Sequence, residues 1–231
     1  MALNSGIEWT DHTWNPWQGC HKVSDGCVNC YMEREKRRYG QDPSVVVRSK
    51  DVTFNSPLKW KDPARVFTCS WSDFFIEEAD AWRSEAWDIM RLTPHLTYLI
   101  LTKRIERAAE RLPADWPWEH VWLGATIEDQ SVAAHRLDHL HRVPGHHFIS
   151  CEPLLGPLNL RRLEWPTEIR HYGRTEWVIA GPETGPIARP MEEDWARDLM
   201  LHCKSAGVPF FLKKGTIDGV QYREIPEGMA R

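Results

Sequence analysis

The sequence lacks any long hydrophobic run, since no segment approaches the roughly 18 apolar residues that cross a bilayer. Its first residues, MALNSGIEW, lack the basic and then apolar pattern of an export signal. Internal repeats and low-complexity segments are also missing. These absences argue against membrane and repeat proteins, and they predict a single cytoplasmic domain over residues 1–231 with no membrane contact.

An excess of positive charge is missing as well. Lys and Arg total 29 and Asp and Glu total 33, which gives a formal net charge of −4. The net charge therefore gives no indication of a nucleic-acid partner. The local basic clusters at 34–38 and 161–162 are typical of a solvated surface.

Six short apolar segments that are rich in strand-forming residues recur along the chain. They cover 66–68, 97–101, 121–126, 147–150, 177–180 and 208–212. Their starts lie 24 to 31 residues apart, which fits one strand and one helix each, because eight such units take about 250 residues in a complete barrel. A further strand is expected near 10–17, and the segment 152–176, rich in Pro and Arg, is expected to be mostly loop.

Helical patterns separate these segments. Apolar residues share one helix face over 77–92, over a stretch that follows a cap at Asp129 and stops before Pro144, and between Pro190 and Gly207. Continuous apolar strands that alternate with helices indicate a parallel sheet whose outer face is covered.

Polar residues follow all six apolar segments, and this decides between two kinds of parallel sheet. An open doubly wound sheet needs functional residues at only one switch point. A β/α barrel instead gathers the carboxyl ends of its strands, and its reactive groups, on one face. The sequence therefore predicts an α/β fold with a partial (β/α)6 barrel, mostly parallel strands and an additional C-terminal strand.

Three of the six cysteines form a C-x6-C-x2-C motif within the segment 19–31. Without an export signal, such a cluster indicates a metal site rather than disulfides. The thiolates of Cys20, Cys27 and Cys30 can bind three irons of a [4Fe–4S] cluster and leave the fourth iron without a protein ligand. In a radical-SAM site, S-adenosylmethionine (SAM) chelates that iron. One electron then cleaves SAM to methionine and a 5′-deoxyadenosyl radical, which abstracts hydrogen from a substrate.

Three other interpretations of the motif stay open. Structural zinc takes four ligands, and His21 is the available fourth, although its position beside Cys20 makes joint tetrahedral ligation awkward. A thioredoxin-type redox pair of Cys27 and Cys30 would leave Cys20 unused. The three cysteines can also be unrelated structural residues.

The sequence resembles the phage-associated three-cysteine-motif family, a radical-SAM-like phage protein family of unknown function. The resemblance covers almost the whole chain in order. The matching stretches are Thr13–Trp17, Gly19–Cys20, Gly26–Tyr31, Ser70–Phe75, Leu101–Arg104, Trp122–Gly124, Ser150–Pro157, Gly181–Pro186, Ala188–Met191 and Gly207–Phe211. The chain departs from the common C-x3-C-x2-C spacing of radical-SAM proteins, and Asn29 replaces the usual aromatic residue before the last cysteine.

This resemblance implies a radical-SAM-type barrel and a radical-SAM enzyme. Its cofactors would be a [4Fe–4S] cluster and SAM, and its partner an electron donor of the flavodoxin or ferredoxin type. The phage association implies DNA or a nucleotide as substrate in the host cytoplasm, most specifically the isomerisation of an amino-acid-modified thymine during DNA hypermodification. Two alternatives are a zinc- or cluster-containing nucleic-acid-binding or regulatory protein without SAM chemistry, and a radical-SAM enzyme that acts on a peptide or small metabolite.

Residues that follow the predicted strands or the cysteines are candidate ligands of SAM. They are Tyr31, Ser70, Asp73, Lys103, Arg104, Glu128, Glu152, Gly181 and Glu183. Lys103 or Arg104 would neutralise the SAM carboxylate, and the four acidic residues would accept hydrogen bonds from its amino group and ribose. Each acidic residue alone is equally typical of a surface charge or a helix cap. Gly181 either allows close approach of the backbone or belongs to a plain turn.

Two further cysteines end predicted strands, and their side chains are expected to point into the barrel mouth. Cys69 and Cys151 are therefore candidate catalytic residues that donate a hydrogen atom to a product radical. The alternative is that each is a small apolar filler. Cys203 lies on an apolar helix face and is predicted to belong to the core.

Overall fold

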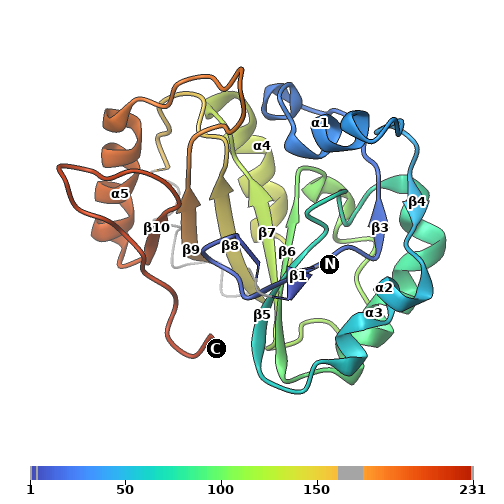
Figure 1. The fold of residues 1–231 in the computed structure, drawn as a ribbon. Helices are drawn as coiled ribbons and strands as arrows, with labels where there is room; N and C mark the ends of the chain where they lie inside the picture. Colours follow the sequence, from blue (N-terminus) through green and yellow to red (C-terminus); the bar gives the residue numbers. More distant parts are fainter. Residues whose placement is uncertain (1, 4, 161–173, 230–231) are drawn as a thin grey trace.

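The computed structural model describes residues 2–3, 5–160 and 174–229. Its main feature is an eight-stranded sheet in which seven neighbouring strands are parallel and curl into a half-barrel (Figure 1). The strands, in spatial order, are β1 (Ala2–Leu3), β2 (His12–Trp14), β5 (Ala64–Thr68), β6 (Leu96–Thr102), β7 (Val121–Thr126), β8 (His146–Cys151), β9 (Thr175–Ala180) and β10 (Phe210–Leu212). The predicted partial barrel with mostly parallel strands is confirmed at this level, and β1 adds one antiparallel edge.

Most of the described helices pack on one face of the sheet. The helices are α1 (Tyr31–Arg38), α2 (Asp51–Phe54), α3 (Asp80–Leu92), α4 (Gln130–His141) and α5 (Glu193–Ala206). Short 3-10 helices span Asp25–Cys27, Ser56–Lys59, Glu77–Ala79 and Ile105–Arg107. The predicted cap of α4 is confirmed, since the Asp129 carboxylate accepts a hydrogen bond from the Ser131 amide at 2.7 Å. None of the described helices is long and apolar enough to cross a membrane.

Two apolar clusters lie on opposite faces of the curled sheet. The larger one fills the space between the sheet and the helices. The smaller one occupies the concave face and consists of Trp9, Phe67, Leu99, Trp122, Phe148, Trp177, Ile179 and Phe211. Ile7 near one end of the chain and Ile225 and Met229 near the other pack against this inner cluster. The strands are therefore buried on both faces, which explains their continuous apolar sequences.

Several element bounds differ from the sequence prediction. The expected strand at 10–17 is divided, because β2 ends at Trp14 and Trp17 belongs to β3 (Trp17–Gln18), which pairs with β4 (Val47–Arg48). The third predicted helix begins at Glu193 rather than beside Pro190. The segment 152–176 is irregular where described until β9 begins at Thr175, and 161–173, with the basic pair at 161–162, lies outside the described residues.

Candidate functional site

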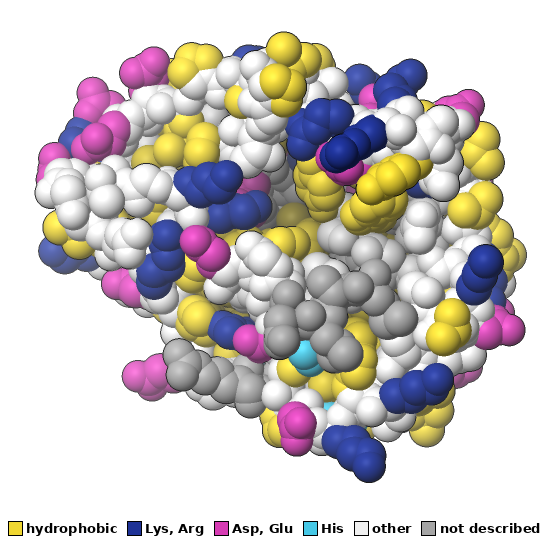
Figure 2. Space-filling model, in the orientation of Figure 1, with side chains coloured by type: hydrophobic (Ala, Val, Ile, Leu, Met, Phe, Trp, Pro, Cys, Tyr) yellow, Lys and Arg dark blue, Asp and Glu magenta, His cyan; other side chains and the backbone are white. Residues whose placement is uncertain are grey.

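A pocket of about 580 Å³ opens at the carboxyl ends of the parallel strands. The space-filling view shows the molecule hollowed there, with Lys and Arg side chains around the opening (Figure 2). Apolar side chains of Ile7, Trp9, Phe67 and Leu101 contribute to its wall, beside polar groups that follow the strands. This is the face on which β/α barrels place their reactive groups.

The cysteine loop, residues 19–31, forms one side of this pocket. Cys20, Cys27 and Cys30 all line it, and all three are free thiols. Gly19 makes the entry to the loop possible, since its φ is +95° and a Cβ there would lie 2.2 Å from the Val45 carbonyl oxygen. The sequence motif thus does bring three thiols to one pocket, as predicted.

The three thiols do not converge on a single point. Within the described ranges, no group of three or more His, Cys, Asp or Glu side chains is arranged to hold a metal ion. His21, the fourth ligand in the zinc interpretation, instead pairs with Glu78 at 2.5 Å on the surface. A tetrahedral zinc site requires convergence of its ligands, whereas a cubane distributes three thiolates over three irons.

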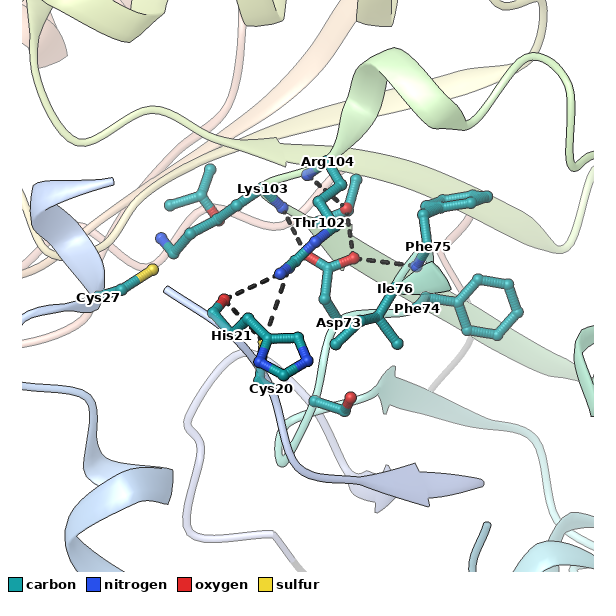
Figure 3. Close-up of polar contacts among 12 residues, drawn as sticks. Cys20, His21, Cys27, Asp73, Phe74, Phe75, Ile76, Thr102, Lys103 and Arg104 are labelled. Atoms are coloured by element: carbon teal, nitrogen blue, oxygen red, sulfur yellow. Dashed lines mark hydrogen bonds and ion pairs between the residues drawn. The ribbon is translucent and has the colours of Figure 1, made fainter. Parts of the chain in front are cut away.

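Arg104 joins the turn after β6 to the cysteine loop. Its Nη1 lies 3.6 Å from the Cys20 sulfur, and its Nη2 donates to the His21 carbonyl oxygen at 2.8 Å (Figure 3). Burial, followed by the charge of Asp73, raises the pKa of Cys20 to about 12, and Arg104 acts in the opposite direction. Burial also raises the pKa of Cys30. Without a metal, both thiols are therefore protonated at neutral pH.

Asp73 organises the turn from which Arg104 projects. One carboxylate oxygen accepts hydrogen bonds from the Thr102 hydroxyl at 2.7 Å and the Phe75 amide at 2.9 Å (Figure 3). The other accepts from the Lys103 amide at 2.8 Å and lies 3.4 Å from Arg104. Asp73 lines the pocket, but its oxygens are already used by the chain.

Glu128 lies behind the pocket wall and is buried. Its carboxylate accepts from the Ser24 hydroxyl at 2.6 Å and from Lys103 Nζ at 2.8 Å, and it also pairs with Arg136. Burial would raise the pKa of Glu128, but the charges of Lys103 and Arg136 hold it below its ordinary value. The predicted acceptor Glu128 and the predicted cation Lys103 are thus paired with each other.

Glu183 is held in a similar way by residues that sequence reasoning missed. Arg189 contacts both of its carboxylate oxygens, and Asn29 Nδ2 donates to it at 2.8 Å. The hydrogen bond from Arg189 lowers the pKa of Glu183 to about 2. Arg189 also donates to the Asp25 carbonyl oxygen at 2.9 Å. Glu183 therefore anchors the cysteine loop from the segment that follows β9.

Among the four predicted acidic acceptors, Glu152 accepts the fewest hydrogen bonds from the described residues. It lines the pocket, with Lys213 Nζ 3.2 Å from its Oε1 and the Ser150 hydroxyl 3.4 Å from its Oε2. Its buried Oε1 has no well-directed hydrogen bond from the described part of the chain. Gly181 allows this packing, because a Cβ there would lie 2.9 Å from that oxygen.

Tyr31 and Trp71 form an aromatic edge of the pocket, and of the two only Tyr31 was predicted as a site residue. The hydroxyl of Tyr31 donates to the carbonyl oxygen of Ser70, and both residues line the pocket beside Trp71. Lys213 and Lys214, which follow β10, line it too. The two lysines could be anticipated from the sequence, because polar residues follow the last apolar segment. Trp71 could be anticipated only from its place after a predicted strand.

The two candidate catalytic cysteines differ in position. Cys69 lines the pocket and has a left-handed backbone, with φ of +68°. Cys151 does not face the pocket, which corrects the sequence prediction. Side chains alternate along β8, so Phe148 points to the concave face and Cys151 to the helices, where it joins Cys203 in the larger cluster. Burial raises the pKa of Cys69 and Cys151 well above the ordinary value.

Comparison with known proteins gives a family without a function. Residues 4–225 match the family described as Protein of unknown function (DUF5131), so the chain belongs to that family. No curated protein and no solved structure matches the chain.

Proposed function

We propose that this member of the DUF5131 family is a radical-SAM enzyme. The observation that carries the proposal is that three free thiols from one short loop line a single pocket, at the carboxyl ends of a curled parallel sheet. This function would require the half-barrel to be a partial barrel of the radical-SAM type.

The donor set fits a [4Fe–4S] cluster held by Cys20, Cys27 and Cys30. All three thiols are free of disulfides, and each would have to lose its proton to bind iron. The guanidinium of Arg104, 3.6 Å from the Cys20 sulfur, favours the thiolate there. When bound, the cluster would supply the electron that cleaves SAM to methionine and a 5′-deoxyadenosyl radical.

Among the predicted SAM acceptors, Glu152 has the best claim to a direct contact. Both carboxylate oxygens of Asp73, Glu128 and Glu183 already accept hydrogen bonds from the chain's own donors. Glu152 lines the pocket, and its buried Oε1 lies 3.2 Å from Lys213 Nζ but receives no directed hydrogen bond from the described residues, so it could accept one from the amino group or ribose of SAM. We therefore assign it as the principal acceptor for SAM.

The substrate that we propose is a modified nucleobase in phage DNA, with isomerisation of an amino-acid-modified thymine as the specific reaction. Support comes from the flat side chains of Trp71 and Tyr31 at the pocket, which suit a planar ring, and from Lys214, which suits a phosphate. An electron donor of the flavodoxin or ferredoxin type would complete the system in the host cytoplasm. Cys69 is the candidate donor of a hydrogen atom to the product radical, and the thiyl radical left on Cys69 would regain its thiol by taking one electron from that donor and a proton from solvent.

Anaerobic reconstitution with iron and sulfide tests this proposal. The full chain should turn brown, give the electron paramagnetic resonance (EPR) spectrum of a reduced cluster, and release 5′-deoxyadenosine from SAM under dithionite. Cys27→Ala should lose the cluster and SAM cleavage while keeping the circular dichroism of the wild type, because the loop lies at the barrel mouth. A colourless protein with one tightly bound zinc, or a full cluster in Cys27→Ala, would overturn the assignment.

Nucleoside mass spectrometry tests the substrate. Phage DNA that carries the amino-acid-modified thymine should yield a nucleoside of unchanged mass and altered chromatographic position. Turnover of a peptide or a small metabolite, with no change in that DNA, would contradict the nucleobase assignment and leave SAM cleavage intact.

A further inference from the structure

The side chain of Glu128 connects the cysteine loop to the barrel wall. Its side chain is 1% exposed, and both carboxylate oxygens are occupied by donors of the chain. Among the described residues, its side-chain donors are Lys103 and Arg136, which belong to the barrel, and Ser24, which belongs to the loop. The Ser24 bond, at 2.6 Å, spans 104 residues of sequence.

Gly26 shows how closely the loop packs on this carboxylate. A Cβ at Gly26 would lie 2.4 Å from Glu128 Cγ and 2.5 Å from its Oε1. Such a distance is far inside van der Waals contact, so the loop backbone lies directly on the Glu128 side chain. The contact is adjacent to Cys27, whose sulfur is 3.9 Å from the Ser24 hydroxyl.

A change of partner at Glu128 is costly. A buried ion pair that loses one member leaves an uncompensated charge in a medium of low dielectric constant. Glu128 therefore cannot turn toward a ligand without leaving Lys103 and Arg136 unpaired. This distinguishes it from Glu152, which lines the pocket.

We propose that Glu128 is a positioning residue that holds the cysteine loop through Ser24, and that it is not a ligand of SAM. The tether itself follows from the contacts above, and its consequence for SAM rests on the proposed function. With the hydroxyl of Ser24 in place, Cys27 keeps a fixed position relative to the pocket. Without it, the loop loses its bond to the buried carboxylate while the barrel network stays complete.

The first experiment uses the metal-free, reduced full chain and needs no cluster. Alkylation of Cys27 by iodoacetamide, followed by peptide mass spectrometry, should be about tenfold faster in Ser24→Ala, the size expected for a lost hydrogen bond to a charged group. Ser24→Thr, which keeps the hydroxyl, should restore the slow rate. Ser205→Ala is the matched control, because this exposed serine donates to the nearby His202 carbonyl oxygen, far from the cysteine loop in sequence, and its rate should equal that of the wild type.

The second experiment uses the reconstituted protein. Ser24→Ala should still load a cluster, but the SAM-induced shift of its EPR spectrum should require about tenfold more SAM. Equal alkylation rates in Ser24→Ala and wild type would overturn the tether. Faster alkylation with unchanged SAM dependence would overturn its role in positioning. If the wild type assembles no cluster, the proposed function fails, and the alkylation rates still decide whether Glu128 holds the loop.

Discussion

At the scale of single residues, Gly124 shows how the concave face accommodates its aromatic side chains. Gly124 lies in β7 opposite Phe148 of β8, and a Cβ there would be 2.4 Å from the Phe148 ring. The ring therefore occupies the volume that a side chain at this position would need. The Phe148 ring can therefore lie this close to β7 only because residue 124 has no Cβ atom.

Gly124→Ala should destabilise the protein by about 1–3 kcal/mol, because overpacking a filled core forces shifts of its neighbours. Urea unfolding followed by circular dichroism measures the change. Gly156→Ala is the matched control, since the nearest atom to its Cβ would be 3.9 Å away. Equal midpoints for the two variants would show that the Phe148 ring is free to move.

Glu152→Gln tests the proposed SAM contact at the same scale. Loss of the charge should raise the dissociation constant of SAM about tenfold, as expected for a hydrogen bond to a charged acceptor. Equilibrium binding to the reconstituted protein provides the measurement. Glu77→Gln, at an exposed position, should bind like the wild type. Wild-type affinity in Glu152→Gln would remove this residue from the site.

At the scale of elements, the sequence predicted the six strands from β5 to β10 well and helix α1 not at all. The strands β6 and β7 are buried along almost their whole length, so their apolar character is visible without the structure. Helix α1 has the sequence YMEREKRR, in which only Met32 and Lys36 are buried. Such a helix presents no apolar stripe, and its place in the fold depends on contacts with distant segments.

The same distinction explains which parts of the site were predictable. The cysteine spacing is a local pattern, and it indicated the three pocket thiols correctly. The bonds Ser24–Glu128 and Asn29–Glu183 join residues 104 and 154 positions apart, and no sequence period relates them. Cys151 was misplaced because a strand end alone does not reveal which face its last residue occupies.

Helix α4 and strand β8 bury two stacked histidines, which should make stability depend on pH. Burial, and then the neighbouring His141, lowers the pKa of His147 to about 3, and burial lowers that of His141 to about 4. Between pH 6.5, the ordinary pKa of histidine, and these lowered pKa values, both histidines bind a proton in the unfolded chain but not in the folded chain. The folded state should therefore lose roughly 1–2 kcal/mol per histidine between pH 6.5 and pH 5.

Chemical denaturation at pH 7, 6 and 5 measures this loss. His147→Phe keeps an aromatic ring and removes one titrating group, so its stability should fall less steeply with decreasing pH. His135→Asn, at an exposed position of α4, should follow the wild type. Identical slopes for His147→Phe and wild type would contradict the argument.

At the scale of the whole molecule, the half-barrel is completed by the two ends of the described chain rather than by further strands. Trp9 is 1% exposed, and its ring lies 4.7 Å from that of Phe67 and 6.3 Å from that of Trp177. Ile225 and Met229 pack against the same inner cluster. The concave face would otherwise expose aromatic side chains of five strands to water.

Trp9→Ala should cost about 3–5 kcal/mol of folding free energy, the range for truncation of a buried aromatic residue. The variant should also bind the dye ANS more strongly, because the inner cluster becomes accessible. Thermal unfolding and dye fluorescence measure the two effects. Trp82→Ala, on the partly exposed side of α3, should show a smaller loss and no added fluorescence. Equal losses of folding free energy in the two variants would mean that Trp9 does not shield the concave face of the sheet from water.

The distribution of the six thiols has a practical consequence. Cys20 and Cys30 are partly accessible beside the pocket, whereas the other four are buried. A bulky maleimide reporter added to the metal-free protein should therefore attach first at those two positions. The natural sequence thus offers attachment points for a spectroscopic probe of ligand entry, with no engineered cysteine and no removal of native ones.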